Sequence, residues 1–128
     1  MIVTDSSVLV ALINEDDNQH EKALKILADI YINRLKLFDF LYIETLSVLR
    51  LKKAETDCVK FINFLDYFEL ALNLSTQETI ELANKYFFQF IKLSFTDCLV
   101  MAGAKIHKAQ IITFDKNLQK AWNQLSKA

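Results

Sequence analysis

Short apolar segments with strand character alternate with helical patterns along the chain, and this alternation restricts the fold more than any other feature of the sequence. Strands are expected at residues 2–4, 35–38, 68–74 and 111–114. The segments between them place apolar residues at helical spacing. Such an order calls for a parallel sheet with helices on both faces. The predicted fold class is therefore α/β, a three-layer α/β/α sandwich around a mostly parallel sheet of about four or five strands.

Capping patterns indicate where several helices begin. An acceptor side chain followed three residues later by an acid is the spacing of a capping box. Three such boxes are predicted: Asn18 with Glu21, Ser75 with Glu78, and Ser94 with Asp97. Asp39 is the expected N-cap of a helix from Phe40 to Lys53. Further helices are expected at residues 6–13, 57–65 and 116–125.

The length and composition fit one compact domain, residues 1–128. Hydrophobic residues make up 52% of the chain, which supports a packed core. No apolar run reaches the roughly 18 residues of a membrane span, so no membrane partner is expected. The N-terminal segment has no basic stretch before its apolar residues, so a signal peptide is not expected either. Two cysteines, Cys58 and Cys98, suit a reducing compartment and predict a cytoplasmic location.

The charge of the chain is unevenly distributed. The net charge of −1 lacks the basic excess of a protein that holds nucleic acid by charge alone. Residues 101–128 nevertheless contain five lysines and one acid. We interpret these lysines as a solvated surface set, and steering of a phosphate backbone towards an acidic site is the alternative. The candidate RNA contacts in this segment are Lys105, His107, Lys108 and Lys116.

Four acids occupy positions where their side chains can meet. Asp5 follows the first strand, and Glu44 lies in the first turns of the helix after the second. Asp97 sits at the start of its helix, and Asp115 ends the last strand. Ligands of parallel sheets bind beyond the carboxyl ends of the strands, so these carboxylates are expected at one edge. Carboxylate oxygens suit Mg²⁺ or Mn²⁺, and such an ion would relieve their mutual repulsion.

Each acid taken singly also fits a structural role. Asp5 would cap the helix that begins at Ser6, and Glu44 would be an exposed helical carboxylate. Asp97 satisfies a capping box, and Asp115 fits a turn. These roles do not explain why all four acids fall near the same predicted edge.

The sequence resembles the PIN family through four segments in the order and spacing of that family's motifs. They are Ile2-Val3-Thr4-Asp5-Ser6-Ser7, residues 43–49 (IETLSVL), residues 96–104 (TDCLVMAGA) and Ile111-Ile112-Thr113-Phe114-Asp115. The resemblance covers essentially the whole chain. Length and layout are most similar to the VapC-type toxins of toxin–antitoxin pairs.

The resemblance implies metal-dependent hydrolysis of single-stranded RNA. It implies Asp5, Glu44 and Asp97 as the main Mg²⁺ or Mn²⁺ ligands, with Asp115 completing the site. Three supporting residues are also implied: Thr113 as a hydroxyl near the metal, Ser6 as a hydrogen-bond partner of a ligand carboxylate, and Asn117. A cognate antitoxin and a homodimer are implied as partners.

The chain departs from the family pattern at two places. Ala109 and Gln110 stand where many relatives place a glycine before the final strand, which puts the geometry of that turn in doubt. Asp39 stands where relatives often have serine.

Other functions remain open from the residues. One is an inactive or housekeeping PIN domain that binds RNA or protein. A receiver-like signalling domain would need an acidic pair after its first strand, whereas Asp5 is followed by Ser6 and Ser7. A structural interaction module is the third, with the apolar helices at residues 8–13 and 57–65 as candidate dimer or partner surfaces.

Overall fold

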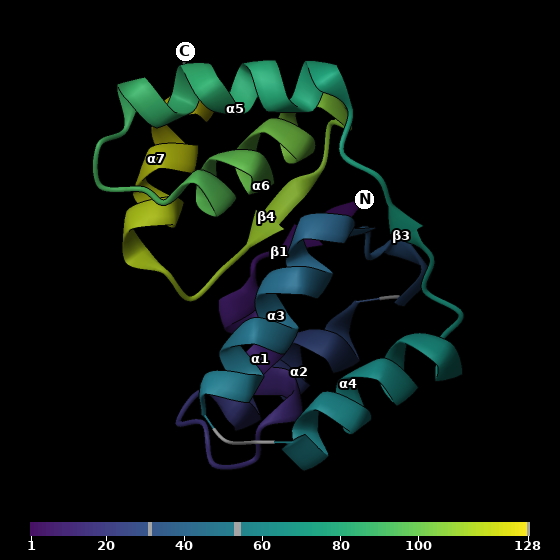
Figure 1. The fold of residues 1–128 in the computed structure, drawn as a ribbon. Coiled ribbons are helices and arrows are strands. Elements are labelled where there is room, and N and C mark those ends of the chain that lie inside the picture. The colour runs from purple at the N-terminus through teal and green to yellow at the C-terminus, as the bar shows by residue number, and fades with distance from the viewer. Residues whose placement is uncertain (31, 53–54, 128) are drawn as a thin grey trace.

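The computed structural model describes residues 1–30, 32–52 and 55–127 (Figure 1). The predicted alternation of strands and helices is confirmed. The elements follow in the order β1 (Ile2–Thr4), α1 (Ser6–Ile13), α2 (His20–Asp29), the 3₁₀ turn η1 (Ile32–Arg34), β2 (Leu37–Phe38), α3 (Asp39–Leu51), α4 (Glu55–Tyr67), β3 (Leu72–Asn73), α5 (Gln77–Gln89), α6 (Phe95–Ile106), β4 (Gln110–Ile112) and α7 (Lys116–Ser126).

All the strand pairs of the described residues are parallel. The first and last strands pair directly, with Val3 opposite Ile111. Strand β2 pairs with β3, and a parallel bridge from Ile2 to Leu35 joins β1 to the segment that leads into β2. The strands therefore lie in the order β4, β1, β2, β3. Because they run in one direction, their carboxyl ends share one edge of the sheet, where ligands of such folds bind.

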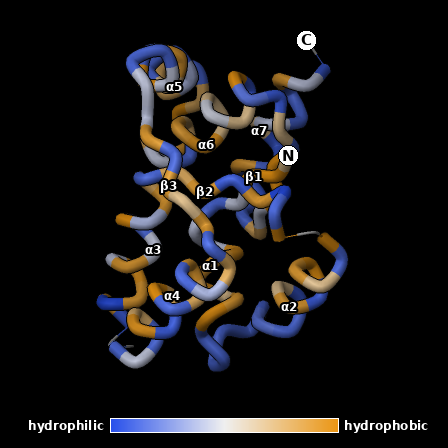
Figure 2. The backbone as a smooth tube through the Cα atoms, turned by 90° about the vertical axis from the view of Figure 1, so that its right-hand side faces the viewer, coloured by the Kyte–Doolittle hydropathy of each residue, from blue (hydrophilic) through white to orange (hydrophobic). Residues whose placement is uncertain are grey.

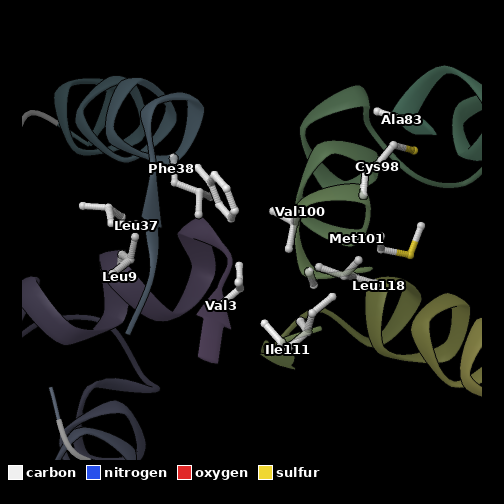
Figure 3. Close-up of a cluster of buried hydrophobic side chains, with 14 of the residues drawn as sticks. Val3, Leu9, Leu37, Phe38, Ala83, Cys98, Val100, Met101, Ile111 and Leu118 are labelled. Atoms are coloured by element: carbon white, nitrogen blue, oxygen red, sulfur yellow. The ribbon is translucent and has the colours of Figure 1, made fainter. Parts of the chain in front are cut away.

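Helices cover both faces of this sheet, as predicted. Helices α1 to α4 pack together on one side, while α6 lies against β1 and β4 on the other, under α5. Neighbouring residues of β2 show both layers, because side chains alternate along a strand. Figure 3 shows Leu37 pointing towards Leu9 of α1 and Phe38 pointing towards Val100 of α6. This three-layer arrangement fixes the starts of α1, α3, α6 and α7 near the carboxyl edge.

Two of the three predicted capping boxes are wrong. Helix α2 begins at His20 after Gln19, with no side-chain cap. Helix α5 is capped by Thr76, whose hydroxyl accepts from the Thr79 amide at 3.2 Å. The third box, at the start of α6, is confirmed.

Asp39 explains why Ser75 does not cap α5. Asp39 is the first residue of α3, and its N-cap is Phe38, so its expected position is wrong by one residue. Its carboxylate accepts hydrogen bonds from the Ser75 hydroxyl at 2.6 Å and the Ser75 amide at 3.2 Å. This pair links the end of β2 to the segment after β3. The predicted end of the same helix at Lys53 lies outside the described residues.

The turn between α6 and β4 contains a left-handed backbone conformation of the kind that usually requires glycine, although no glycine is present there. Lys108 has a φ of 53°, in the left-handed region. The Ala109 amide donates to the Ala104 carbonyl at 2.8 Å and the Lys108 amide to the Lys105 carbonyl at 3.3 Å, the pattern of a Schellman motif. A non-glycine residue in this conformation costs about 1 kcal/mol relative to glycine.

The two apolar helices proposed as partner surfaces differ in exposure. Residues 8–13 are mostly buried between the sheet and the other helices. The prediction that they form a dimer or partner surface is therefore wrong. Helix α4 does expose Val59 and Ile62. Figure 2 shows apolar and polar residues interspersed along α4. No helix of residues 1–30, 32–52 and 55–127 combines the length and apolarity needed to cross a bilayer.

Candidate active site

Asp5 is the most firmly held carboxylate at the carboxyl edge of the sheet. Only 4% of the residue is exposed. Ser7 Oγ donates to one carboxylate oxygen and Thr113 Oγ1 to the other, each at 2.6 Å. Burial raises the pKa of Asp5, although both hydroxyls act to lower it. The parallel pairing of β1 with β4 brings Thr113 to this position.

The same hydroxyls tie the start of α1 to the loop that follows β4. Ser7 Oγ accepts from the Phe114 amide at 3.2 Å, and Thr113 Oγ1 accepts from the Asp115 amide at 2.9 Å. The sequence points to Ser6 as the hydroxyl beside a ligand carboxylate and misses Ser7. The signal was available, because a serine two residues after an acid at a helix start is within reach of that acid's side chain.

Asp97 and Asp115 both lie at helix starts and both have capping roles. Asp97 Oδ2 accepts from the Ser94 amide at 3.2 Å, which completes the capping box of α6. Asp115 Oδ1 accepts from the Asn117 and Leu118 amides at 2.8 and 3.1 Å, as the N-cap of α7. Asn117 therefore meets Asp115 through its backbone, and its side chain is exposed. In each case only one carboxylate oxygen accepts these capping bonds, and the second oxygen of Asp97 and of Asp115 takes no part in them.

Glu44 completes the acidic group from the first half of α3. It is half-buried rather than exposed. Burial raises the pKa of Glu44, and the charges of Asp97 and Asp5 raise it further. The nearby hydroxyl of Ser6 acts to lower the pKa of Glu44. Ser6 and Ser7 thus serve two different carboxylates.

The structure brings the four predicted acids close enough to interact electrostatically. Burial is the main cause that raises the pKa of Asp97, followed by the charges of Asp115 and Asp5. Asp115 also raises the pKa of Asp5. The salt bridges of the described residues lie elsewhere, joining Arg50 to Glu55 and Lys60 to Glu15 and Asp57. The group therefore carries negative charge with no basic side chain paired to it in the part of the chain that is described.

These carboxylates are not gathered into a direct three-residue metal cage. Among the described residues, no three histidine, cysteine or acidic side chains lie close enough together to hold an ion. Mg²⁺ retains several waters and is often bound through one or two carboxylates, so an all-oxygen, unpaired donor set of this kind still fits such an ion.

An open groove adjoins the acidic group. It has a volume of about 350 Å³, and its walls include Ser6, Ser7, Phe114 and Lys52. Phe114, which lies between Thr113 and Asp115 in the sequence, forms part of the groove wall. The Lys22 ammonium lies 5.4 Å from the centre of the Phe114 ring. None of the four acids lines this groove, which approaches them through their neighbours Ser6, Ser7 and Phe114.

Asp97→Asn should stabilise the metal-free protein at neutral pH. The pKa of Asp97 is raised above its ordinary 3.8, so the folded state binds protons more readily than the unfolded chain. The free energy of unfolding therefore falls as pH rises from 3.8 through the raised pKa, and the loss is complete above it. The asparagine variant escapes this loss.

Urea unfolding at a series of pH values, without divalent ions, measures the effect. The advantage of Asp97→Asn over wild type should grow from acid to neutral pH. Asp66→Asn, which removes an exposed charge on α4, is the matched control and should show no such trend. A difference that stays constant with pH would contradict the prediction.

The candidate RNA contacts are divided between two ends of the molecule. Lys116 begins α7 next to Asp115. Lys105, His107 and Lys108 lie at the opposite end of α6 from Asp97. The His107 ring packs 5.5 Å from that of Phe38, and burial, then Lys36, lowers the pKa of His107.

The PIN domain family profile matches residues 2–122, and the chain belongs to the PIN domain family. Among curated proteins, none matches the sequence.

Two solved structures have a similar fold. One is the VapC20 toxin of Mycobacterium tuberculosis, described as cleaving the sarcin–ricin loop. It is 20% identical, with a TM-score of 0.84 over 94% of this chain and 95% of that one. The other is a toxin–antitoxin complex from Klebsiella pneumoniae, 15% identical, with a TM-score of 0.67 over 90% of this chain and 87% of that one. At these identities the likeness shows the shared fold alone.

Proposed function

We propose that this PIN domain is a metal-dependent endoribonuclease that hydrolyses phosphodiester bonds of single-stranded RNA. The observation that carries the proposal is the unpaired acidic group of Asp5, Glu44, Asp97 and Asp115 at the carboxyl edge of the sheet. Concentrated negative charge repels RNA unless a cation intervenes. A site built in this way therefore suits a phosphate substrate only together with a divalent ion.

Asp5, Glu44 and Asp97 would hold Mg²⁺ or Mn²⁺, directly or through water, and Asp115 would complete the site. The bound cation supplies positive charge that activates water and offsets the charge that develops on the phosphate. Ser7 and Thr113 fix the orientation of Asp5 through their short hydrogen bonds. Ser6 positions Glu44, and the caps of Asp97 and Asp115 hold these side chains at the helix starts.

The similar structures support a toxin role within this activity. The VapC20 toxin is described as cleaving the sarcin–ricin loop, and the Klebsiella pneumoniae structure as a toxin–antitoxin complex. We therefore propose that the chain is the toxin of a type II pair. A cognate antitoxin, a homodimer and a cytoplasmic location belong to the same proposal.

Cleavage should require a divalent metal ion. Single-stranded RNA incubated with the purified protein should be cut in Mn²⁺ or Mg²⁺ and left intact in a chelator, and added metal should restore cutting. The metal should also raise the thermal midpoint at neutral pH, because it neutralises the acidic group in the folded state.

The two readouts separate the alternatives. A metal-induced rise in the midpoint without cleavage would favour an inactive PIN domain that binds RNA or protein. If the metal neither raises the midpoint nor supports cleavage, both the proposed metal site and the proposed nuclease activity are wrong.

A further inference from the structure

A second pocket lies at the far end of α6 and α7 from the acidic group. It has a volume of about 290 Å³. Lys105 of α6, Lys108 of the turn that follows and Trp122 of α7 line it, with Ala104, Ala109 and Leu125 among the apolar walls. None of the described residues that line this pocket is acidic. Its walls therefore combine an aromatic surface with two positive charges, which suits an anionic ligand that carries a flat ring.

The backbone at this pocket is strained. Lys108 holds the left-handed conformation that favours glycine, at a φ of 53°. The Schellman turn accounts for this conformation and places Lys108 just beyond the end of α6. Lys105 and Lys108 both line the pocket.

The exposed face of α7 connects the pocket to the acidic group. Helix α7 begins after its N-cap Asp115, and its 11 residues extend roughly 16 Å to the pocket. A shallow hollow along it has only lysine and amide side chains as walls: Lys116, Gln119, Lys120, Asn123, Gln124 and Lys127. Such side chains donate to phosphate and sugar oxygens. These donors extend along α7 from Lys116, next to Asp115, to Lys127, next to the pocket residue Ser126.

We propose that the exposed face of α7 and the Trp122 pocket form a binding track for single-stranded RNA. One base stacks on Trp122, its phosphate lies between Lys105 and Lys108, and the strand continues along α7 to the carboxylates. The inference rests on the proposed ribonuclease function for the nature of the strand. It assigns binding roles to Lys120, Lys127 and Trp122 in addition to the lysines named from the sequence.

Trp122 reports directly on this pocket, because it is the only tryptophan of the chain. A single-stranded RNA oligonucleotide long enough to cover α7, titrated into the wild-type protein in chelator, should quench its fluorescence saturably. A dinucleotide can fill the pocket but cannot span α7, so it should quench the fluorescence only at a higher phosphate concentration. The quench itself reports the stacking of a base on the indole.

Variants test the same track through the affinity for fluorescently labelled RNA. Trp122→Leu keeps an apolar side chain against the core and should weaken binding by roughly fivefold to a hundredfold. Lys108→Gln should make the slope of log affinity against log salt shallower by about 0.7, the loss of one phosphate contact. Lys25→Gln, an exposed charge on α2, is the matched control and should leave both values unchanged.

The outcomes separate this inference from the proposed function. RNA that binds and is cut with no change in tryptophan fluorescence would overturn the track and leave the nuclease in place. RNA that quenches Trp122 but is never cut would support the track and contradict the nuclease. An acidic peptide that quenches as strongly as RNA at equal charge, with equal salt dependence, would reassign the surface to a protein partner and overturn the inference.

Discussion

Asp97→Asn is expected to reduce RNA cleavage by at least roughly a hundredfold, because it removes one carboxylate from a site whose charge holds the metal ion. The fold should survive the change. The Asp97 amide still donates to Ser94 Oγ, and the new side-chain carbonyl oxygen replaces the carboxylate oxygen that accepts from the Ser94 amide. Initial rates of RNA cleavage in saturating Mn²⁺ measure the effect.

Asp66→Asn is the control for this experiment, since it removes the same charge from an exposed position on α4. Its cleavage rate should match wild type. Asp97→Asn should also lose the metal-induced rise in the thermal midpoint. Digestion of RNA by Asp97→Asn at the wild-type rate would show that this carboxylate has no role in the reaction.

Gly103→Val is expected to destabilise the protein by about 3 kcal/mol, because the core has no space for a side chain there. A Cβ at Gly103 would lie 2.8 and 2.9 Å from two ring atoms of Phe38. That ring is 1% exposed and stacks on Phe40 at 5.3 Å between centroids, so it has little freedom to move. Gly103→Ala should cost less, since the better helix propensity of alanine returns about 1 kcal/mol.

Urea unfolding of both variants measures these losses, and a smaller side chain at position 38 provides the check. In a Phe38→Leu background, Gly103→Val should cost less than in wild type, because the two substitutions are coupled through the same contact. Equal costs in the two backgrounds would place the strain somewhere other than at this ring.

The order of the elements and the positions of the acids were predictable because they depend on local patterns. The apolar periodicity of each segment indicates its type, and the Ser94–Asp97 box is complete within four residues of sequence. The rule that parallel strands share a carboxyl edge then placed Asp5 and Asp115 together.

The rest depended on contacts between distant segments. Ser75 has the local pattern of a cap, but Asp39, 36 residues away, takes its hydroxyl and amide instead. Thr113 reaches Asp5 from 108 residues away, a contact that no local pattern could indicate. With one glycine and no proline to mark the turns, the strands could be located but their ends could not.

The pairing of the first strand with the last has a consequence during synthesis on the ribosome. Asp5 emerges early, but its partner hydroxyl on Thr113 lies 108 residues later in the chain, and its neighbour Asp115 follows two residues after that. A nascent chain therefore cannot assemble the acidic edge until residues 113–115 have left the exit tunnel. The proposed ribonuclease site is thus absent throughout the translation of the segments that precede them.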